Sequence, residues 1–203
     1  MAWTFYNSSG EAMIIDGGLA NVVEDTTPQL GGNLDMQARL LVGNGGSTGI
    51  AISANGEVTM AAQPAVAVRN SVKDSNVTGA GTAATVDFNI EEYDQNADFA
   101  SDTFTAPVTG QYHISVQVQF LGLTSASTSM LLNVISSNRN FRVVVDNSAP
   151  AITEFYMPFS MDVNMDAADT VTVTLTIYGE SSDVVDIDGS SEGRTTFSAR
   201  LVA

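Results

Sequence analysis

The chain has 203 residues, enough for one domain of about 100 to 150 residues and a shorter appendage. Charged residues make up 15% of it, against roughly 25% in a typical globular protein, and Gly, Ser, Thr, Asn and Val are abundant, which favours an all-β protein. Acidic residues outnumber basic ones 23 to 7, and the formal net charge of −16 excludes nucleic acid and anionic lipid as partners.

The chain contains no cysteine, which excludes a disulfide, a thiolate zinc site and a cysteine nucleophile. Its first ten residues, MAWTFYNSSG, have neither the basic nor the apolar part of a secretory signal, so we expect synthesis and assembly in a cytoplasm. Residues 111–137 lack Asp, Glu, Lys and Arg, but polar side chains recur throughout them. We therefore expect no insertion into a membrane.

Residues 1–62 are rich in glycine and in turn signals. Short strand candidates lie between the turns at residues 14–15, 40–42, 50–52 and 58–60. These strands are too short and too sparse to enclose a core. We therefore predict that residues 1–62 form a segment that needs a partner, and that the folded domain covers residues 63–203.

The folded domain shows the alternation of apolar and polar residues that is typical of strands with one face in a core. The alternation is sustained at residues 111–120, 155–165 and 171–177, where the odd-numbered positions are polar in the first segment and apolar in the other two. Pro158 has no backbone N–H, which places the second segment at a sheet edge or a bulge. Weaker strand candidates lie at residues 65–72, 85–88, 130–135, 141–145 and 195–202. About eight to ten strands and no helical pattern predict a β-sandwich or jelly roll.

The phrase FTAPVTGQY at residues 104–112 lies within a longer segment, residues 88–120, of regularly placed aromatic, acidic and glycine positions. The positions concerned are Phe88, Asp94, Phe99, Phe104, Gly110 and Tyr112, with Phe197 in the last strand candidate. Together they resemble the signature of the complement C-one-q and tumour-necrosis-factor jelly-roll superfamily. The gap from Phe99 to Phe104 is two residues shorter than is usual there. The resemblance implies an all-β jelly roll of approximately ten strands over residues 63–203.

Domains of this superfamily are trimers whose inner sheets pack around a threefold axis, so the resemblance implies a homotrimer. The strands that begin at Gly110, at Ile152 and near Thr195 would form the inner sheet. The expected interface residues are Gln111, His113, Gln117, Tyr156 and Ser160. Tyr156 is expected nearest the axis, because a tyrosine can bury its ring while its hydroxyl keeps a partner. The alternative is an ordinary solvated strand face.

His113 is the only histidine of the chain. Histidine changes its charge between pH 5 and 8, so three copies near an axis would make the stability of the trimer depend on pH.

Residues 22–35, VVEDTTPQLGGNLD, resemble a segment that recurs in tail-fibre and other structural proteins of bacteriophages, notably marine and cyanobacterial ones. The resemblance implies that residues 1–62 attach the protein to a virion. The residues that we expect to mediate attachment are Glu24, Asp25, Pro28, Leu30 and Leu34.

The sequence specifies no catalytic residue, and we expect the protein not to be an enzyme. A hydrolytic triad would have to use His113, which lies in the middle of a strand with no nearby nucleophile signature. The glycine run at residues 43–49 lacks the Lys-Ser/Thr ending of a phosphate loop.

Two acidic clusters offer the oxygen ligands that calcium prefers. One consists of Asp183, Asp186 and Asp188, and the other of Asp94, Asn96 and Asp98. Several members of the superfamily bind calcium in loops of the knob. Neither cluster matches a fixed motif, however, and solvated acidic loops are the other interpretation. No other cofactor is expected.

These observations predict a bacteriophage virion structural protein, a homotrimeric tail-fibre or surface-fibre knob that binds a host-surface glycan or protein. It would lie on the virion surface after synthesis in the host cytoplasm. The first alternative is a capsid decoration or head-fibre protein that stabilises the shell and is present in many more copies. A bacterial lectin-like adhesin is a further alternative, which the missing export signal disfavours.

Overall fold

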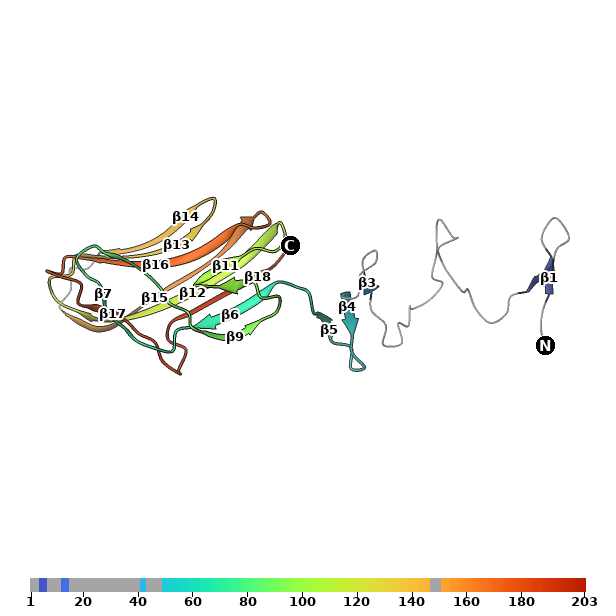
Figure 1. The fold of residues 1–203 in the computed structure, drawn as a ribbon, viewed down its shortest axis with the longest axis horizontal. Coiled ribbons are helices and arrows are strands. Elements are labelled where there is room, and N and C mark those ends of the chain that lie inside the picture. Colours follow the sequence, from blue (N-terminus) through green and yellow to red (C-terminus); the bar gives the residue numbers. More distant parts are fainter. Residues whose placement is uncertain (1–3, 7–11, 15–40, 43–48, 147–150) are drawn as a thin grey trace. The chain divides into compact units, whose positions relative to one another are not determined.

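The computed structural model describes residues 4–6, 12–14, 41–42, 49–146 and 151–203 (Figure 1). Contacts divide the chain into two units, Met1–Arg39 and Leu40–Ala203. The predicted boundary between residues 62 and 63 stays a prediction. In the described part of the chain, no helix is long and apolar enough to cross a membrane.

Before residue 63, the regular structure that is described consists of short antiparallel strands. In the first unit β1 (Thr4–Tyr6) pairs with β2 (Ala12–Ile14). In the second, β4 (Gly49–Ile52) pairs with both β3 (Leu41–Val42) and β5 (Val58–Met60).

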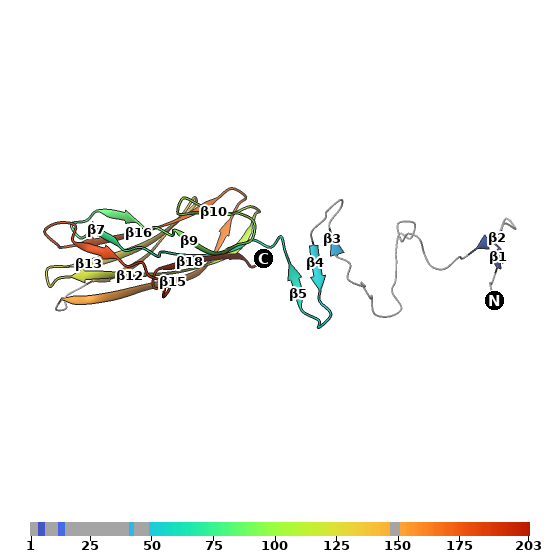
Figure 2. The same cartoon turned by 60° about the horizontal axis from the view of Figure 1, so that its bottom comes forward.

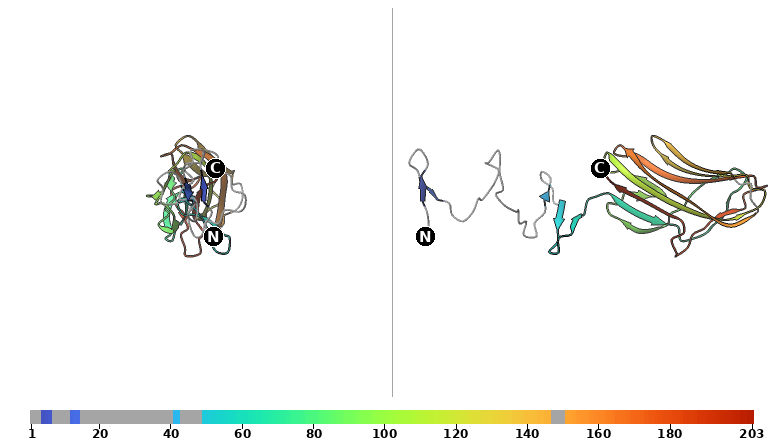
Figure 3. Two further views of the ribbon diagram at one scale, coloured as in Figure 1. Left: turned by 90° about the vertical axis from the view of Figure 1, so that its right-hand side faces the viewer. Right: turned by 180° about the vertical axis from the view of Figure 1, so that it is seen from behind.

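The rest of the second unit is a sandwich of two antiparallel sheets. The larger sheet contains β6 (Ala65–Arg69), β7 (Asp74–Thr78), β9 (Ile90–Asp94), β12 (Gly110–Leu123), β15 (Ile152–Met165), β17 (Val185–Ile187) and β18 (Thr196–Leu201). The smaller sheet contains β8 (Ala83–Thr85), β10 (Phe99–Ala100), β11 (Thr103–Thr105), β13 (Ser129–Ser136), β14 (Asn140–Asp146) and β16 (Thr170–Tyr178). Figure 3 shows the two layers again from behind.

Strand order identifies this sandwich as a jelly roll. The eight principal strands run in the order β6-β18-β12-β15 in one sheet and β11-β16-β13-β14 in the other. In chain order these are strands 1-8-3-6 and 2-7-4-5, and every pairing is antiparallel. Two interleaved Greek keys of this kind make a jelly roll, so the predicted fold class is confirmed.

The three sustained alternations are the long strands β12, β15 and β16, and, apart from Met161, their apolar positions face the core as predicted. Tyr112, Ile114, Val116, Val118 and Phe120 of β12 are all buried. β15 pairs with β12 alone, from Ile152 to Met165, so Pro158 lies on an edge strand as expected. Figure 2 shows β12, β15 and β18 side by side.

The residues of the superfamily signature lie together at one end of the core. Phe88, Phe99, Phe104, Tyr112 and Phe197 are buried in a cluster of rings whose centroids lie 5.5 to 6.4 Å apart. The Tyr112 hydroxyl donates to the Val108 carbonyl at 2.8 Å. The Asp94 carboxylate accepts the backbone N–H groups of Asp98 and Phe99, both at 2.9 Å, and so fixes the loop before β10.

Gly110 stands where a side chain has no room. A Cβ at this position would lie 2.5 Å from Leu201 Cδ1 and 2.6 Å from the Ala203 carbonyl oxygen. The glycine therefore permits the last strand to pack against the first residue of β12.

The structure differs from the prediction in three respects. β1, β7, β9, β10, β11 and β17 were not expected, because strands of two to five residues carry too little alternation to be recognised. Gln119, on the polar side of its strand, is fully buried. Met161, expected in the core, is 42% exposed because it lies on the edge strand, beyond which the described residues place no further strand.

Candidate functional site

The outward surface of β6, β18, β12 and β15 is continuous and polar. We call it the polar face, and its members are Ala65, Ala67, Arg69, Gln111, His113, Ser115, Gln117, Glu154, Tyr156, Pro158, Ser160, Asp162, Asn164, Thr196, Ser198 and Arg200. All five residues that were predicted to form a trimer interface belong to it. Strand register alone brings them together, since β12 pairs with β15 along its whole length and with β18 over its first half.

Small side chains form the middle of the polar face. The pairings place Ala67, Ser198, Ser115 and Ser160 in one row across the four strands. A row of alanine and serine leaves a depression of about 290 Å³ over Ala67, Ser115 and Ser198, so another surface can approach closely there.

The charges on the polar face balance one another. It carries Arg69 and Arg200 and two carboxylates, Asp162 and Glu154, in a chain where acidic residues outnumber basic ones 23 to 7. Two copies of such an acidic protein repel each other, and the repulsion is weakest where the charges of a surface cancel.

His113, on β12, contacts β15 through its imidazole. Its Nδ1 lies 2.7 Å from Asp162 Oδ1, and its Nε2 lies 3.1 Å from Ser160 Oγ. Arg200 is the cross-strand neighbour of His113 on the other side, on β18. The charged groups around the imidazole are thus one carboxylate and one guanidinium, on different strands.

A chain of contacts in the order of a hydrolytic triad runs from Ser160 through His113 to Asp162. The sequence did not reveal this arrangement because Ser160 is remote from His113 in the chain. The other requirement is a set of N–H donors aimed at the developing oxyanion. The backbone N–H groups of a strand lie in the plane of its sheet, whereas Ser160 Oγ stands above that plane. The sheet therefore supplies no oxyanion hole at Ser160, and the arrangement reads as a hydrogen-bonded chain that orients His113.

Tyr156, the residue predicted nearest a threefold axis, is 42% exposed. Its cross-strand partner is Gln119, which is buried and donates to Glu154 Oε2 at 3.0 Å. Tyr156 thus lies beside a buried, hydrogen-bonded side chain, and part of its own surface is exposed for contact with another molecule.

Asp183, Asp186 and Asp188 each have a different partner. Asp186 accepts from Lys73 Nζ at 2.7 Å and from the Asn76 N–H at 2.8 Å, and Asp183 accepts from the Ala80 N–H at 2.9 Å. The Asp188 carboxylate lies 3.5 Å from the Arg194 guanidinium. Burial alone would raise the pKa of Asp186, but the bond from Lys73 and the Asn76 N–H lower it overall.

Within the described residues, no three His, Cys, Asp or Glu side chains gather into a group that could hold a metal ion. The second cluster is no exception, because both Asp94 oxygens accept backbone N–H groups. Calcium binding therefore stays a prediction. Glu24, Asp25, Pro28, Leu30 and Leu34, predicted to attach the protein to a virion, lie outside the described residues.

The sequence did not indicate a groove at one end of the sandwich. It is lined by residues that include Gln111, Asn138 and Asn164, from two strands and a turn. Periodicity identifies the strand residues as outward-facing, but nothing in the sequence brings Asn138, which lies in the turn between β13 and β14, next to them.

Comparisons with known proteins bear on the fold alone. No protein-family model and no curated protein matches the sequence. The globular domain of a zebrafish complement 1qA protein is similar, with a TM-score of 0.47 and 15% identity over 70% of this chain and 98% of that chain. Murine APRIL at pH 8.5 is similar with a TM-score of 0.47 and 13% identity over 69% of this chain and 99% of that chain.

Proposed function

We propose that this protein is a non-enzymatic homotrimer that assembles through the polar face and serves as a knob on the surface of a bacteriophage particle. The single observation that carries the proposal is the polar face itself, a continuous sheet surface with small side chains in its middle and balanced charges, in a strongly acidic chain.

The open side of the sandwich supports assembly as well. Among the described residues, β15 pairs on one side only, with β12, and so leaves an open edge of 14 residues; long exposed edges favour association with another chain. Phe155 and Phe159 of β15 and Phe141 of β14 are only partly buried there. A neighbouring copy that placed its polar face against this edge would cover both surfaces.

Contact between two different surfaces is heterologous, and it closes into a ring when the rotation allows. Three copies are proposed because of the superfamily resemblance of residues 88–120. Three knobs on one stem would also turn weak single contacts with a receptor into stable attachment.

Location on a virion is proposed from the resemblance of residues 22–35 to structural proteins of bacteriophages. Residues 1–62 would make the attachment, and the jelly roll would face the host. A place on the tail serves receptor binding, whereas a place on the capsid serves to stabilise the shell.

Light scattering of the full chain tests the trimer. We expect a mass of about three times 21.3 kDa that persists on dilution. Ser115→Glu puts a carboxylate in the middle of the polar face and should yield monomers, whereas the control Val144→Glu, at a 53% exposed position on the other sheet, should not. A wild-type protein with native circular dichroism and the mass of one chain contradicts the proposal.

Cross-linking and mass spectrometry of purified particles test the location. Links between residues 1–62 and a tail or capsid protein are expected, and the copy number per particle separates the two places. Absence of the chain from particles of a phage that encodes it contradicts the virion proposal.

A further inference from the structure

The three-stranded sheet of β3, β4 and β5, which we call the stem sheet, exposes an apolar surface (Figure 1). Ile50 pairs with Met60, and Ile52 pairs with Val58. Directly opposed residues of antiparallel strands lie on the same face, as do residues two apart in one strand, so these four side chains share one face. They are 39%, 42%, 51% and 61% exposed, in that order. An apolar patch exposed in this way marks a site of interaction.

The opposite face of the stem sheet is small and polar. Ala51 pairs with Thr59 on that side. In the turn next to this pair, the Ser53 hydroxyl donates to the Glu57 carboxylate, and this bond holds the pKa of Glu57 below its ordinary value. A sheet with two such different faces needs cover on its apolar face only.

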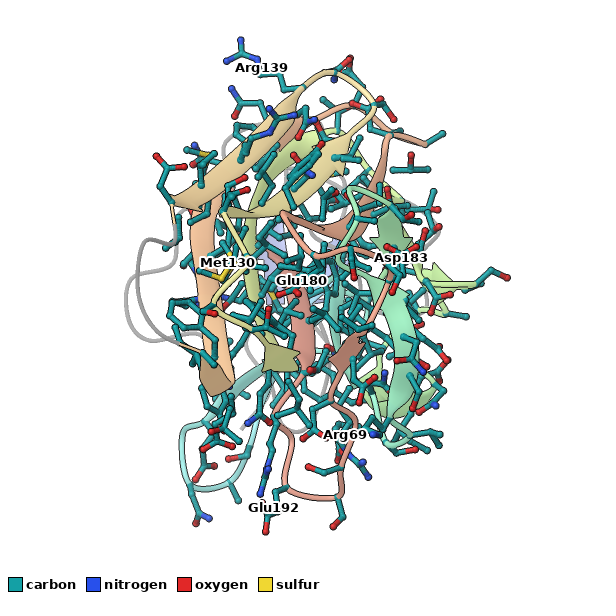
Figure 4. All side chains as sticks on the ribbon, turned by 90° about the vertical axis from the view of Figure 1, so that its left-hand side faces the viewer. Arg69, Met130, Arg139, Glu180, Asp183 and Glu192 are labelled. Atoms are coloured by element: carbon teal, nitrogen blue, oxygen red, sulfur yellow. The ribbon has the colours of Figure 1, made fainter. Side chains whose placement is uncertain are left out.

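Charge is almost absent from this part of the chain. Glu57 is the only Asp, Glu, Lys or Arg of residues 40–68, whereas the whole chain has 23 acidic and 7 basic residues. Charged side chains lie instead on the surface of the jelly roll, where Figure 4 shows Arg139 and Glu192 extending away from the ribbon. Copies of the stem sheet can therefore approach one another without the repulsion that acts between the rest of these acidic chains.

The chain that leaves β5 is fastened to the jelly roll by the loop that follows β9. Gln95 Nε2 donates to the carbonyls of Met60 and Ala61 at 3.1 and 3.3 Å. Asn96 Nδ2 donates to the Ala62 carbonyl at 3.3 Å. These bonds hold the end of the stem sheet at the start of the jelly roll.

The proposed subunit contact begins a few residues further along the chain. Ala65, the first residue of β6, belongs to the polar face. It follows Met60 by five residues, which span at most about 18 Å. Three jelly rolls joined through their polar faces would therefore bring three stem sheets together at an effective concentration on the order of 1 mM. Another copy of the same sheet is thus the partner that the apolar face meets first.

We infer that three stem sheets pack their apolar faces together around the threefold axis and form a second subunit contact, separate from the polar face. The inference rests on the proposed function, because the trimer of jelly rolls supplies the tether. It assigns residues 49–60 to the trimer contact and leaves the preceding residues for attachment to the virion.

Disulfide formation between copies of the full chain tests the inference, since the chain has no cysteine of its own. Ile52→Cys places a thiol on the apolar face, and the matched control Ala51→Cys places one on the opposite face of the same strand. With diamide as the oxidant, Ile52→Cys should form covalent dimers at least about tenfold faster than Ala51→Cys, because a disulfide needs two Cβ atoms about 3.5 to 4.5 Å apart. Circular dichroism of both variants checks that the jelly roll is folded.

Light scattering on dilution gives a second measurement, with carboxylates in place of thiols. The double variant Ile52→Asp with Val58→Asp would place six carboxylates between the three sheets, so the trimer should dissociate at a protein concentration about tenfold higher or more. The control, Ala51→Asp with Thr59→Asp, adds the same charge to the other face and should dissociate like the wild type.

The two measurements separate the inference from the proposed function. A wild-type trimer in which Ile52→Cys and Ala51→Cys react equally, or in which the two double variants dissociate alike, overturns the inference alone. A trimer that Ile52→Asp with Val58→Asp reduces to monomers, but that Ser115→Glu leaves intact, supports the inference and overturns the contact through the polar face. A wild-type chain that is monomeric overturns both.

Discussion

Truncation of Phe197 to alanine should remove a large part of the stability of the jelly roll. The side chain is 1% exposed, and its ring centroid lies 5.8, 5.6 and 6.4 Å from those of Phe88, Phe99 and Phe104. A buried Phe→Ala change costs about 3 to 5 kcal/mol, because the lost burial is compounded by the cavity that remains. Since a whole domain is stable by about 5 to 15 kcal/mol, the variant should be close to unfolding at 37 °C.

Urea unfolding followed by circular dichroism measures this cost, at one fixed protein concentration because assembly makes the midpoint depend on concentration. Tyr178→Ala, on the other sheet, is the control. Its side chain is 41% exposed and lies outside the proposed subunit contact, so the loss should be less than half as large. Equal losses for the two variants, or a loss below about 1 kcal/mol for Phe197→Ala, would refute the assignment of the core.

Three further changes test other parts of the structure. Gly110→Ala should cost about 1 to 3 kcal/mol in the same assay, because the new Cβ meets Leu201 at 2.5 Å, and an unchanged midpoint would contradict the packing. Burial and repulsion from Asp102 raise the pKa of Asp87. Protonated Asp87 therefore contributes its full stabilisation below the pKa of the unfolded chain, about 3.9, and this stabilisation is lost as the pH rises through the pKa of the folded protein. Asp87→Asn should therefore raise the thermal midpoint at pH 7 but not at pH 3, and equal effects at both would exclude this cause. His113→Gln removes the imidazole that lies 2.7 Å from Asp162 and 3.1 Å from Ser160, so the trimer should dissociate more readily in the variant than in the wild type. Identical dissociation of both proteins would exclude a role for the imidazole.

Long strands were predictable from the sequence because their environment repeats every two residues. β12, β15 and β16 each have one face in the core over nine or more residues, and so their alternation is sustained. Gln119 departs from this pattern for a tertiary reason. Its backbone N–H donates to Thr195 Oγ1 and its side chain to Glu154, contacts that no local pattern encodes.

The candidate site was predictable only where it depends on strand register. The polar face follows from the alternation of β12 and β15 once their pairing is inferred from the resemblance. The partners of Asp183, Asp186 and Asp188 come from residues more than 100 positions away or across a turn, so a cluster in the chain did not become a cluster in space. The contact between Ser160 and His113 could not be predicted from the sequence either, because the two residues are 47 positions apart.

The most direct test of the central claim is the reactivity of one cysteine in the polar face, since the chain has none of its own. Ser160→Cys changes one oxygen to sulfur at an exposed position of the single chain, and Val144→Cys places the same probe on the outer surface of the other sheet. If the polar face is the subunit contact, a maleimide labels the native Ser160→Cys protein slowly and the Val144→Cys protein fast, and unfolding of both proteins in urea removes the difference. Equal labelling of the two native proteins at a concentration where light scattering finds trimers would show that assembly uses another surface.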